Sequence, residues 1–556
     1  MKELLLRNFT FNPKDDILSG LTVALALVPE AIAFAFVAGL TPIVGLYGAF
    51  MMGIITAMFG GRPGMISGAT GATAVVMVAL IKGGQEWGAM QGLEGDTGLL
   101  FLLVTLLMVG VLQIVAGVFK LGKFVRLIPH PVMMGFVNGL AIVIFISQKG
   151  MFKKPVLENG SKTPLPQGEG NGFITEWLSG SELWTMLALV VLTMVIMYFL
   201  PKLTKKIPSA LVAILVVAII VIFGGVNTAT VNSFITDGLP DGQIGSVSGG
   251  LPTFRLDVFN PLLWTKSNLL FMLPFAIVLA AVGLIESLMT LNLVDELTDT
   301  RGSGNRECIA QGSANMINGL FGGMGGCAMI GQSIINVNSG GRGRLSGIIA
   351  ALALLLFILF GGPMIGKIPI AALVGVMFMV VIGTFAWSSF RILHKIPKAD
   401  AAVLVAVSAI TVYKDLAVAV IAGVILSALV FAWKNATMIR ARKSLKVDGT
   451  KIYQIWGPLF FGSVQAFNSK FEPTIDPDAI EIDFIESKVS DHSGIEAVRG
   501  IANKYLDLGK SVKLTHLSPD CKALLLKANH KFSTIIETSI EDPRYYVVTD
   551  NMDEEV

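Results

Sequence analysis

The chain has 556 residues, of which 53% are hydrophobic and only 15% charged, and its mean hydropathy is +0.71. A soluble protein carries about a quarter charged residues, and here the apolar residues fall in runs of the roughly 20 residues that cross a bilayer as a helix. Composition therefore excludes a soluble protein, whereas the net charge of +3 carries no topology because the placement of Lys and Arg matters more than their sum.

The three cysteines have neither paired nor metal-ligand spacing, so no disulfide framework or zinc site is expected. No constellation of catalytic residues occurs either, and an enzyme is not expected.

Residues 1–14 are polar and charged and lack the apolar stretch of a signal peptide, so the first span is itself the insertion signal. The third span is predicted as a half-helix, because a Gly/Ser/Thr-rich entry precedes only about ten strongly apolar residues, too few to cross alone. Polar segments follow the fifth and seventh spans. The seven spans predicted in the first half are 17–40, 42–60, a half-helix beginning near Thr70, 98–118, 131–148, 183–200 and 208–223.

The second half repeats this plan, again with a half-helix in third place. Its spans are predicted at 269–291, a short one around 314–321, a half-helix beginning near Met329, 345–360, 368–387, 400–412 and 416–433. Basic residues follow every even-numbered span from the fourth onward, and such residues in short loops mark the cytoplasmic side. The sequence therefore predicts a multi-pass protein of the plasma (inner) membrane with about fourteen spans and both termini cytoplasmic.

The composition changes near Val447, where β-rich runs begin to alternate with amphipathic helical runs. This alternation predicts a small α/β domain. The predicted organisation is a cytoplasmic N-terminus (1–14), a transmembrane domain (15–434), a linker (435–449), the α/β domain (450–550) and an acidic tail (551–556).

Each half places an acid upstream of its half-helix. Glu30 in span one precedes Thr70 by 40 residues, and Glu286 in span eight precedes Met329 by 43. Seven spans are an odd number, so the second half runs in the opposite sense and the two halves form a seven-plus-seven inverted repeat. In such folds the half-helices of the two repeats meet near the bilayer midplane, with the substrate between their N-termini.

The chemistry of two facing helix starts favours a small, compact anion. A helix start carries unpaired N–H groups and roughly half a positive charge, so two starts attract an anion without a Lys or Arg. Glycines in the breaks (Gly68, Gly71, Gly325, Gly326 and Gly331) are expected to let the ligand approach bare backbone. The candidate substrate-binding residues are Glu30, Ala69, Thr70, Gly71, Met329, Ile330, Gly331 and Gln332.

The two acids point to cation coupling. An ionised acid at mid-membrane costs at least ~2.5 kcal/mol and repels an anion, so Glu30 or Glu286 is expected to take H⁺ or Na⁺ before the anion enters. Thr290, one turn after Glu286, offers an oxygen, so these two residues would be the metal ligands if the cation is Na⁺. The competing interpretations are acids paired structurally with polar neighbours and glycine breaks that serve close helix packing.

Several stretches together resemble the SulP family of anion permeases, bacterial relatives of vertebrate sulfate, chloride and bicarbonate exchangers. They are DILSGLTVALALVPEAIAFA, GGRPGMISGATGATAVV, IPHPVMMGFVNGLAIVI, NRECIAQGSANMINGLFGGM, the SGGR of Ser339 to Arg342, and DLAVAVIAGVILS. The resemblance implies a uracil-permease-like fold, in which a core domain (spans one to four and eight to eleven) moves against a gate domain. It also implies a homodimer and a cytoplasmic STAS domain, which residues 452–467 and 489–498 resemble.

Some residues depart from the family pattern. Many members have Gln at Glu30, and some vertebrate members have Arg at Gln332, so a bound cation has more charge to balance here. Sodium-coupled bicarbonate members also carry an acid at Glu286, but they have small residues at Met329 and Ile330, which argues against a sodium site. In the STAS domain Ser493 matches a phosphorylatable serine, so it is a candidate regulatory site beside the interpretation as a helix N-cap.

The sequence thus favours a secondary active transporter of a small inorganic anion, with sulfate or bicarbonate first. The alternatives are an uncoupled anion exchanger or channel, a C4-dicarboxylate or nucleobase permease on the same fold, and a membrane-anchored regulator acting through its STAS domain. The expected partners are the anion, the bilayer, a second copy of the chain and a cytoplasmic partner of the STAS domain. No nucleic acid and no cofactor beyond H⁺ or Na⁺ is expected.

Overall fold

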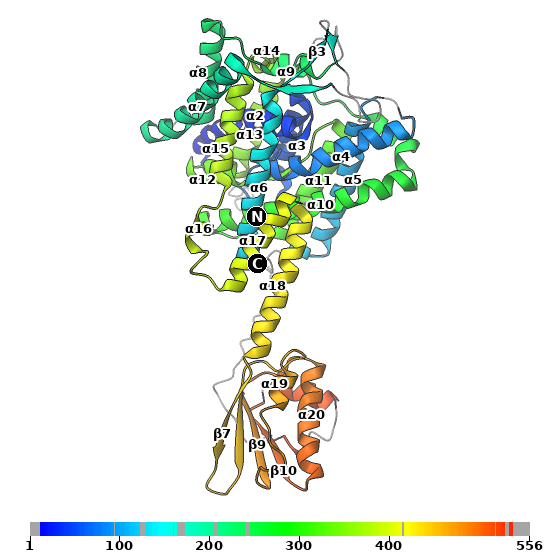
Figure 1. The fold of residues 1–556 in the computed structure, drawn as a ribbon, viewed down its shortest axis with the longest axis vertical. Helices are drawn as coiled ribbons and strands as arrows, with labels where there is room; N and C mark the ends of the chain where they lie inside the picture. The colour runs from blue at the N-terminus through cyan, green and yellow to red at the C-terminus, as the bar shows by residue number, and fades with distance from the viewer. Residues whose placement is uncertain are drawn as a thin grey trace. The chain divides into compact units, whose positions relative to one another are not determined.

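The computed structural model describes residues 12–93, 95–122, 129–158, 161–163, 173–204, 208–239, 245–247, 249–413, 416–517, 519–528 and 533–536. The chain divides into two compact units, Met1–Val424 and Ile425–Val556. Figure 1 shows the first as a bundle of helices and the second as a small sheet covered by helices. The acidic tail predicted at 551–556 lies outside the described residues.

All fourteen predicted spans are helices, which confirms the plan of the membrane domain. Among the described residues seven helices are long and apolar enough to cross a membrane by length and composition, and the others are shorter. The helices of the first half are α2 (Pro13–Ala38), α3 (Pro42–Phe59), α4 (Gly71–Met90), α5 (Thr97–Val118), α6 (His130–Ser147), α7 (Gly180–Leu203) and α8 (Ser209–Gly224). Those of the second half are α10 (Lys266–Thr298), α11 (Gly304–Phe321), α12 (Ile330–Asn338), α13 (Arg344–Phe360), α15 (Ile370–Thr384), α17 (Lys398–Tyr413) and α18 (Leu416–Thr437).

The polar segments hold short elements that the sequence did not predict. Strands β2 and β5 pair antiparallel, as do β3 and β4. The remaining elements of this unit, apart from two central strands described below, are η2 (Gln148–Phe152), β2 (Lys153–Pro155), β3 (Leu157–Glu158), β4 (Ser161–Lys162), β5 (Thr175–Trp177), α9 (Val231–Asp237), η3 (Leu256–Phe259), η4 (Pro261–Trp264), α14 (Gly362–Ile365) and α16 (Ser388–Ile392).

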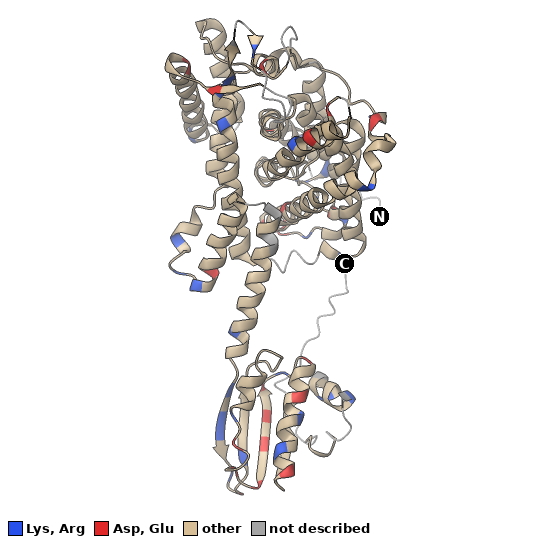
Figure 2. Ribbon diagram, turned by 45° about the vertical axis from the view of Figure 1, so that its right-hand side comes forward, with Lys and Arg blue, Asp and Glu red and all other residues tan. Residues whose placement is uncertain are grey.

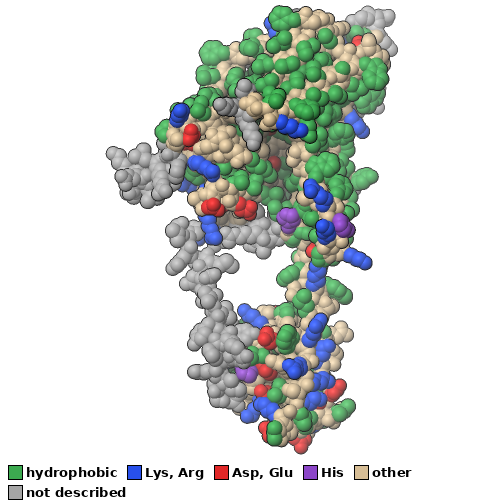
Figure 3. Space-filling model, turned by 90° about the vertical axis from the view of Figure 1, so that its left-hand side faces the viewer, with side chains coloured by type: hydrophobic (Ala, Val, Ile, Leu, Met, Phe, Trp, Pro, Cys, Tyr) green, Lys and Arg blue, Asp and Glu red, His purple; other side chains and the backbone are tan. Residues whose placement is uncertain are grey.

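Helix packing follows the inverted repeat. Helix α5 of the first half packs against α10 and α11, and its counterpart α13 packs against α2 and α3. The pair α6 with α17 likewise corresponds to the pair α15 with α7. Exchanging the two halves converts one set of contacts into the other. Helices α2 to α5 together with α10 to α13 form the core domain, which carries α4 and α12, the helices that begin after the glycine breaks. The surface of this unit is largely hydrophobic in Figure 3, as a lipid-facing surface requires.

Two helices are longer than predicted. Span nine was expected only around 314–321, but α11 begins at Gly304. Its first turns carry Glu307 and Gln311, which lower the hydropathy but are fully buried against protein. Helix α4 likewise continues beyond its ten apolar residues to Met90, so its break marks where the helix begins and does not shorten it to half a span.

The second unit is an α/β domain with strand order β10–β9–β8–β7. Strands β7 and β8 are antiparallel, and β8, β9 and β10 are parallel. Helix α20 buries Ile495, Val498 and Ile501 against Tyr453 and Ile482 of the sheet. Its elements are β7 (Arg440–Leu445), β8 (Lys451–Trp456), α19 (Val464–Asn468), β9 (Ala479–Glu486), α20 (His492–Asp507), β10 (Ser511–Thr515) and α21 (Pro519–Ala528).

The predicted linker 435–449 needs correction. Residues 440–445 form the edge strand β7, which pairs with β8 along its whole length. The change of composition that predicts the α/β domain begins only near Val447, after this strand. Strand β7 is rich in basic residues, which are typical of exposed edge strands. Figure 2 shows these basic positions on the sheet, while charged residues are sparse on the helices of the first unit.

Candidate functional site

The centre of the core domain is a crossing of two very short strands. Strand β1 (Ser67–Gly68) pairs antiparallel with β6 (Cys327–Ala328). Helix α4 begins just after β1 with Thr70 as its N-cap, and α12 begins just after β6 with Met329 as its N-cap. Neither cap side chain accepts a hydrogen bond from a first-turn amide of the helix it precedes. The crossing therefore brings together two helix starts from opposite halves of the chain, each with first-turn amides that its own cap does not occupy.

Hydrogen bonds from two serines of the second repeat and from the backbone hold this crossing. The amide of Ile66 donates to Ser333 Oγ at 3.0 Å, and the amide of Ala328 donates to Ser287 Oγ at 3.1 Å. The amide of Met329 donates to the carbonyl oxygen of Ile66 at 2.8 Å. These buried backbone groups would be costly without partners, so both serines fix the crossing although neither was a candidate from the sequence.

Asn315 of α11 binds the backbone of Gly326, the residue directly before β6. Its Oδ1 accepts from the amide of Gly326 at 2.9 Å, and its Nδ2 donates to the carbonyl oxygen of Gly326 at 3.1 Å and to Gln113 Oε1 at 3.0 Å. A Cβ on Gly326 would lie 2.0 Å from the carbonyl oxygen of Gly68. Gly326 is thus required by the strand crossing, which corrects the expectation that this glycine exposes backbone to a ligand.

The other glycines of the breaks also differ from one another. Cβ atoms at Gly68 and Gly325 would meet Met329 and Asn315 respectively, so these positions are packed too. A Cβ on Gly71 would lie 2.6 Å from Ile144 Cδ1 of α6, whereas Gly331 has no atom within 4 Å of that position.

Bare backbone is therefore accessible at the start of α12 in this structure. The start of α4 is covered by Ile144, which sequence reasoning missed because an isoleucine in an apolar span carries no distinguishing signal.

Glu30 of α2 lies against the first turn of α12. The side-chain amide Nε2 of Gln332 donates a hydrogen bond to the Glu30 carboxylate. Gln332 is buried, whereas Glu30 is only part-buried. The structure thus brings an acid from the first repeat to the helix start of the second, as the sequence predicted, and Ile330, also part-buried, lies in the same turn.

Glu286 of α10 is linked to the start of α4. Its carboxylate accepts from Cys327 Sγ at 2.9 Å, and the same sulfur lies 3.1 Å from Thr70 Oγ1. Thr70 Oγ1 in turn lies 3.0 Å from Thr73 Oγ1. Ala69, almost fully buried, joins β1 to this N-cap. Each acid therefore contacts groups at one of the two helix starts.

Two further candidates lie differently from the expectation. The hydroxyl of Thr290 donates to the backbone carbonyl of Glu286 at 2.8 Å, so its partner in this structure is the backbone and its role as a sodium ligand stays a prediction. In the C-terminal domain Asp491 is the N-cap of α20 and accepts from the amide of Gly494 at 2.8 Å. The N-cap interpretation of Ser493 is therefore wrong, and its regulatory role stays a prediction.

A third buried acid was not predicted. Glu307 of α11 accepts from the amide of Gly61 and from Gln311 Nε2, both at 2.7 Å, and Gln311 Nε2 also lies 2.8 Å from Ser67 Oγ of β1. This chain of contacts ties α11 and the end of α3 to the central crossing. The sequence signal available was the spacing of Glu307 and Gln311, which lie four residues apart before the predicted span nine.

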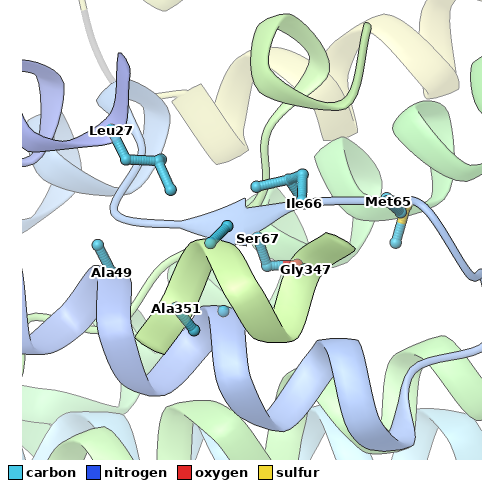
Figure 4. Close-up of a pocket in the computed structure, with 9 residues that line it drawn as sticks. Leu27, Ala49, Met65, Ile66, Ser67, Gly347 and Ala351 are labelled. Carbon is cyan, nitrogen blue, oxygen red and sulfur yellow. The ribbon is translucent and has the colours of Figure 1, made fainter. Parts of the chain in front are cut away.

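A small apolar cavity lies beside the crossing (Figure 4). Its space is about 10 Å³, which is enough for roughly one water molecule. It is too small and too apolar for the predicted anion. Its lining comprises Leu27, Ala49, Gly53, Met65, Ile66, Ser67, Gly347, Ala350 and Ala351.

Two inverted halves that direct two helix starts and two acids to one centre define the architecture of a secondary transporter. The sequence pattern of the Sulfate permease family matches residues 14–407, and that of the STAS domain matches residues 442–542. The chain belongs to the sulfate permease family, a family of anion transporters, and carries a C-terminal STAS domain.

Known proteins resemble the chain along most of its length. "Putative sulfate transporter YbaR" of Bacillus subtilis is 40% identical over 515 residues, covering 92% of this chain and 96% of the relative. "Bicarbonate transporter BicA" of Picosynechococcus sp. is 31% identical over 518 residues, covering 88% of this chain and 86% of the relative. The solved structure of murine Slc26a9, an anion transporter in the inward-facing state, superposes with a TM-score of 0.75 at 16% identity over 97% of this chain and 94% of that one. At that identity the likeness shows the fold.

Proposed function

We propose that the chain is a secondary active transporter of a small inorganic anion, coupled to H⁺ or Na⁺. Sulfate and bicarbonate are the first candidates, because the two relatives are named for these anions. We place the protein in the plasma (inner) membrane as a homodimer with both termini and the STAS domain on the cytoplasmic side, where the basic residues after even-numbered spans put them.

The observation that carries this proposal is the pairing of each helix start with an acid. The starts of α4 and α12 offer first-turn amides and the positive ends of two helix dipoles, which bind a compact anion. Glu286 reaches the start of α4 through Cys327, and Glu30 reaches the start of α12 through Gln332. An ionised acid at either start competes with a substrate anion for the same positive potential.

Cation binding relieves this competition. Once a proton or sodium ion neutralises Glu30 or Glu286, the positive potential of the helix starts becomes available to the anion, and the two ions bind cooperatively. In the reverse sense, a bound anion strengthens cation binding by the same factor, because coupling between two sites is reciprocal.

The contact at Gly71 gives a place for alternating access. Ile144 belongs to α6, outside the core domain, and covers the start of α4 together with Phe34. Movement of the core domain relative to α6 would carry Gly71 away from Ile144 without breaking the β1–β6 crossing, while Phe34 of α2 would move with the core domain. The binding centre would then open to one side of the membrane at a time.

Uptake into proteoliposomes tests the proposal. Labelled sulfate and labelled bicarbonate are offered under a proton gradient, a sodium gradient or neither, with Glu30→Gln and Glu286→Gln beside the unchanged protein. Glu86→Gln is the matched control, because Glu86 lies exposed near the far end of α4.

We expect one of the two anions to accumulate under one of the two gradients. Glu30→Gln or Glu286→Gln should abolish the dependence of uptake on that gradient, whereas Glu86→Gln should leave it unchanged. Uptake that ignores both gradients would indicate an exchanger or a channel, and competition by uracil would indicate a nucleobase permease. Normal, coupled transport by both central variants would refute the carboxylate assignment.

A further inference from the structure

The first strand of the STAS domain lies directly after a membrane helix. The apolar run of α18 ends at Trp433, and tryptophan is typical of the interface between membrane and water. Helix α18 ends at Thr437, and β7 begins at Arg440. Chain connectivity alone therefore keeps β7 close to the lipid headgroups.

The register of the sheet shows which side chains of β7 face away from the core. Ala441 packs against the hydrophobic core of the domain and is paired with the fully buried Ile455. Side chains alternate along a strand, so Arg440 and Arg442 lie on the opposite, open face of the sheet. There Arg440 is paired with Trp456 and Arg442 with Gln454.

Most of the neighbouring basic side chains are already neutralised. Lys443 pairs with Glu472 at 3.1 Å, Lys446 pairs with Glu481, and Lys451 pairs with Asp476. Within the part of the chain that the structure describes, neither Arg440 nor Arg442 pairs with an acid.

The acids that share the open face do not cancel these arginines. Glu481 and Asp483 of β9 are only 7% and 8% exposed. Glu481 is held by Lys446, and Asp483 by His516 at 2.8 Å. Glu486 of β9 is exposed and is paired with the half-exposed Trp456 in the sheet, so one acid lies beside the two arginines. The arginines outnumber this acid, so the exposed charge near β7 is positive on balance, and Figure 2 shows the basic positions along this strand.

We propose that this Arg–Trp face, formed by Arg440, Arg442 and Trp456, docks on anionic phospholipid headgroups of the membrane that α18 crosses. Guanidinium groups bind phosphate oxygens in pairs, and an indole ring settles at the headgroup level. Basic residues just beyond a membrane helix are attracted to an anionic leaflet. The face thereby anchors the edge of the STAS domain to the bilayer, a role separate from transport.

A fluorescent label at Ser444 tests the docking in the full chain. Ser444 is exposed and shares the face of Arg440 and Arg442 by alternation, and the native cysteines are buried, so Ser444→Cys can be labelled selectively. The protein is placed in nanodiscs of phosphatidylcholine alone or with three parts in ten of phosphatidylglycerol, each containing a lipid with a nitroxide headgroup. A label at Lys504→Cys, exposed on α20, is the control site.

We expect the nitroxide to quench the label at Ser444→Cys only in the anionic nanodiscs, and the label at Lys504→Cys in neither. Adding Arg440→Gln and Arg442→Gln should lower the ratio of docked to undocked protein roughly thirtyfold, because each basic residue near an anionic leaflet contributes about a fivefold factor. Arg499→Gln with Lys504→Gln removes the same charge from α20 and should leave the quenching unchanged. Molar salt should reverse the docking, since it shortens the screening length to about 3 Å.

Two results would overturn the proposal, provided that the variants elute as monodisperse protein. One is quenching that is absent, or equal with and without the anionic lipid. The other is disulfide formation between the Ser444→Cys positions of two protomers, which would make the face a contact between copies of the chain.

Discussion

Substitutions at Gly326 and Gly331, two glycines of the same break, can distinguish a packing role from a role in ligand access. A Cβ on Gly326 would lie 2.0 Å from the carbonyl oxygen of Gly68, while a Cβ on Gly331 would have no atom within 4 Å. Gly326→Ala and Gly331→Ala thus add the same methyl group, five positions apart, to a packed crossing and to open space.

The cost at Gly326 follows from that contact. A carbon and a carbonyl oxygen normally approach to about 3.3 Å, so the added methyl forces β1 and β6 apart by more than about 1 Å. Overpacking a core typically costs about 1–3 kcal/mol, and here the obstacle is backbone that also carries the register of both helix starts. At Gly331 the same change relieves the poor helix propensity of glycine, which is worth up to about 1 kcal/mol.

Thermal unfolding in detergent and anion uptake in proteoliposomes measure the two effects separately. We expect Gly326→Ala to lower the apparent Tm by several degrees and to abolish uptake. Gly331→Ala should keep or raise the Tm but increase the KM for the anion, because its methyl enters the space in front of the α12 amides. A Gly326→Ala protein with unchanged Tm would refute the reading of the crossing, and a Gly331→Ala protein with unchanged KM would place the anion elsewhere.

The remaining predictions concern Cys327 and Asp476. Cys327→Ala removes a hydrogen-bond donor to the Glu286 carboxylate, and such a bond is worth about 1.5–3 kcal/mol when one partner is charged. Half-maximal transport should therefore need roughly tenfold less of the coupling cation, which a cation titration of uptake measures. Cys327→Ser should behave like the unchanged protein, and Cys308→Ala, at a buried cysteine elsewhere, should have no effect. In the STAS domain burial acts to raise the pKa of Asp476, but hydrogen bonds from Lys451 and the two tyrosine hydroxyls of the domain core outweigh burial and hold this pKa below its usual value. A lowered carboxyl pKa stabilises the fold above the unfolded-state value and loses that contribution as pH falls through the folded-state value. Asp476→Asn should therefore destabilise the domain by about 3 kcal/mol at neutral pH, and the difference in unfolding should shrink below about pH 4; a gap that stays constant with pH would contradict this assignment.

The positions of the spans and of both helix starts follow from the sequence because hydropathy and glycine breaks are local signals. Thr70 and Met329 are the N-caps that the breaks indicated, and the contacts of Glu30 and Glu286 agree with the predicted meeting of two repeats. The pairing of acid and break in each half was enough to propose the inverted repeat.

What the sequence could not provide depends on neighbours distant in the chain. From the sequence, Gly326 suggests backbone accessible to a ligand, and only the structure shows the carbonyl of Gly68 beside it. Glu307 reads as a loop residue until Gly61 and Gln311 bury it. Strand β7 reads as a charged linker because an edge strand has few apolar residues to reveal it.

The backbone crossing at the centre of the molecule also restricts how cargo can move. Its two strands belong to different repeats, and the strand pairing, together with the bonds of Ile66 to Ser333 and Met329, locks them together. Moving the two repeats apart would break these bonds and would also separate the two helix starts. Under the proposed function, we therefore expect the anion to move together with the intact core domain relative to the surrounding helices.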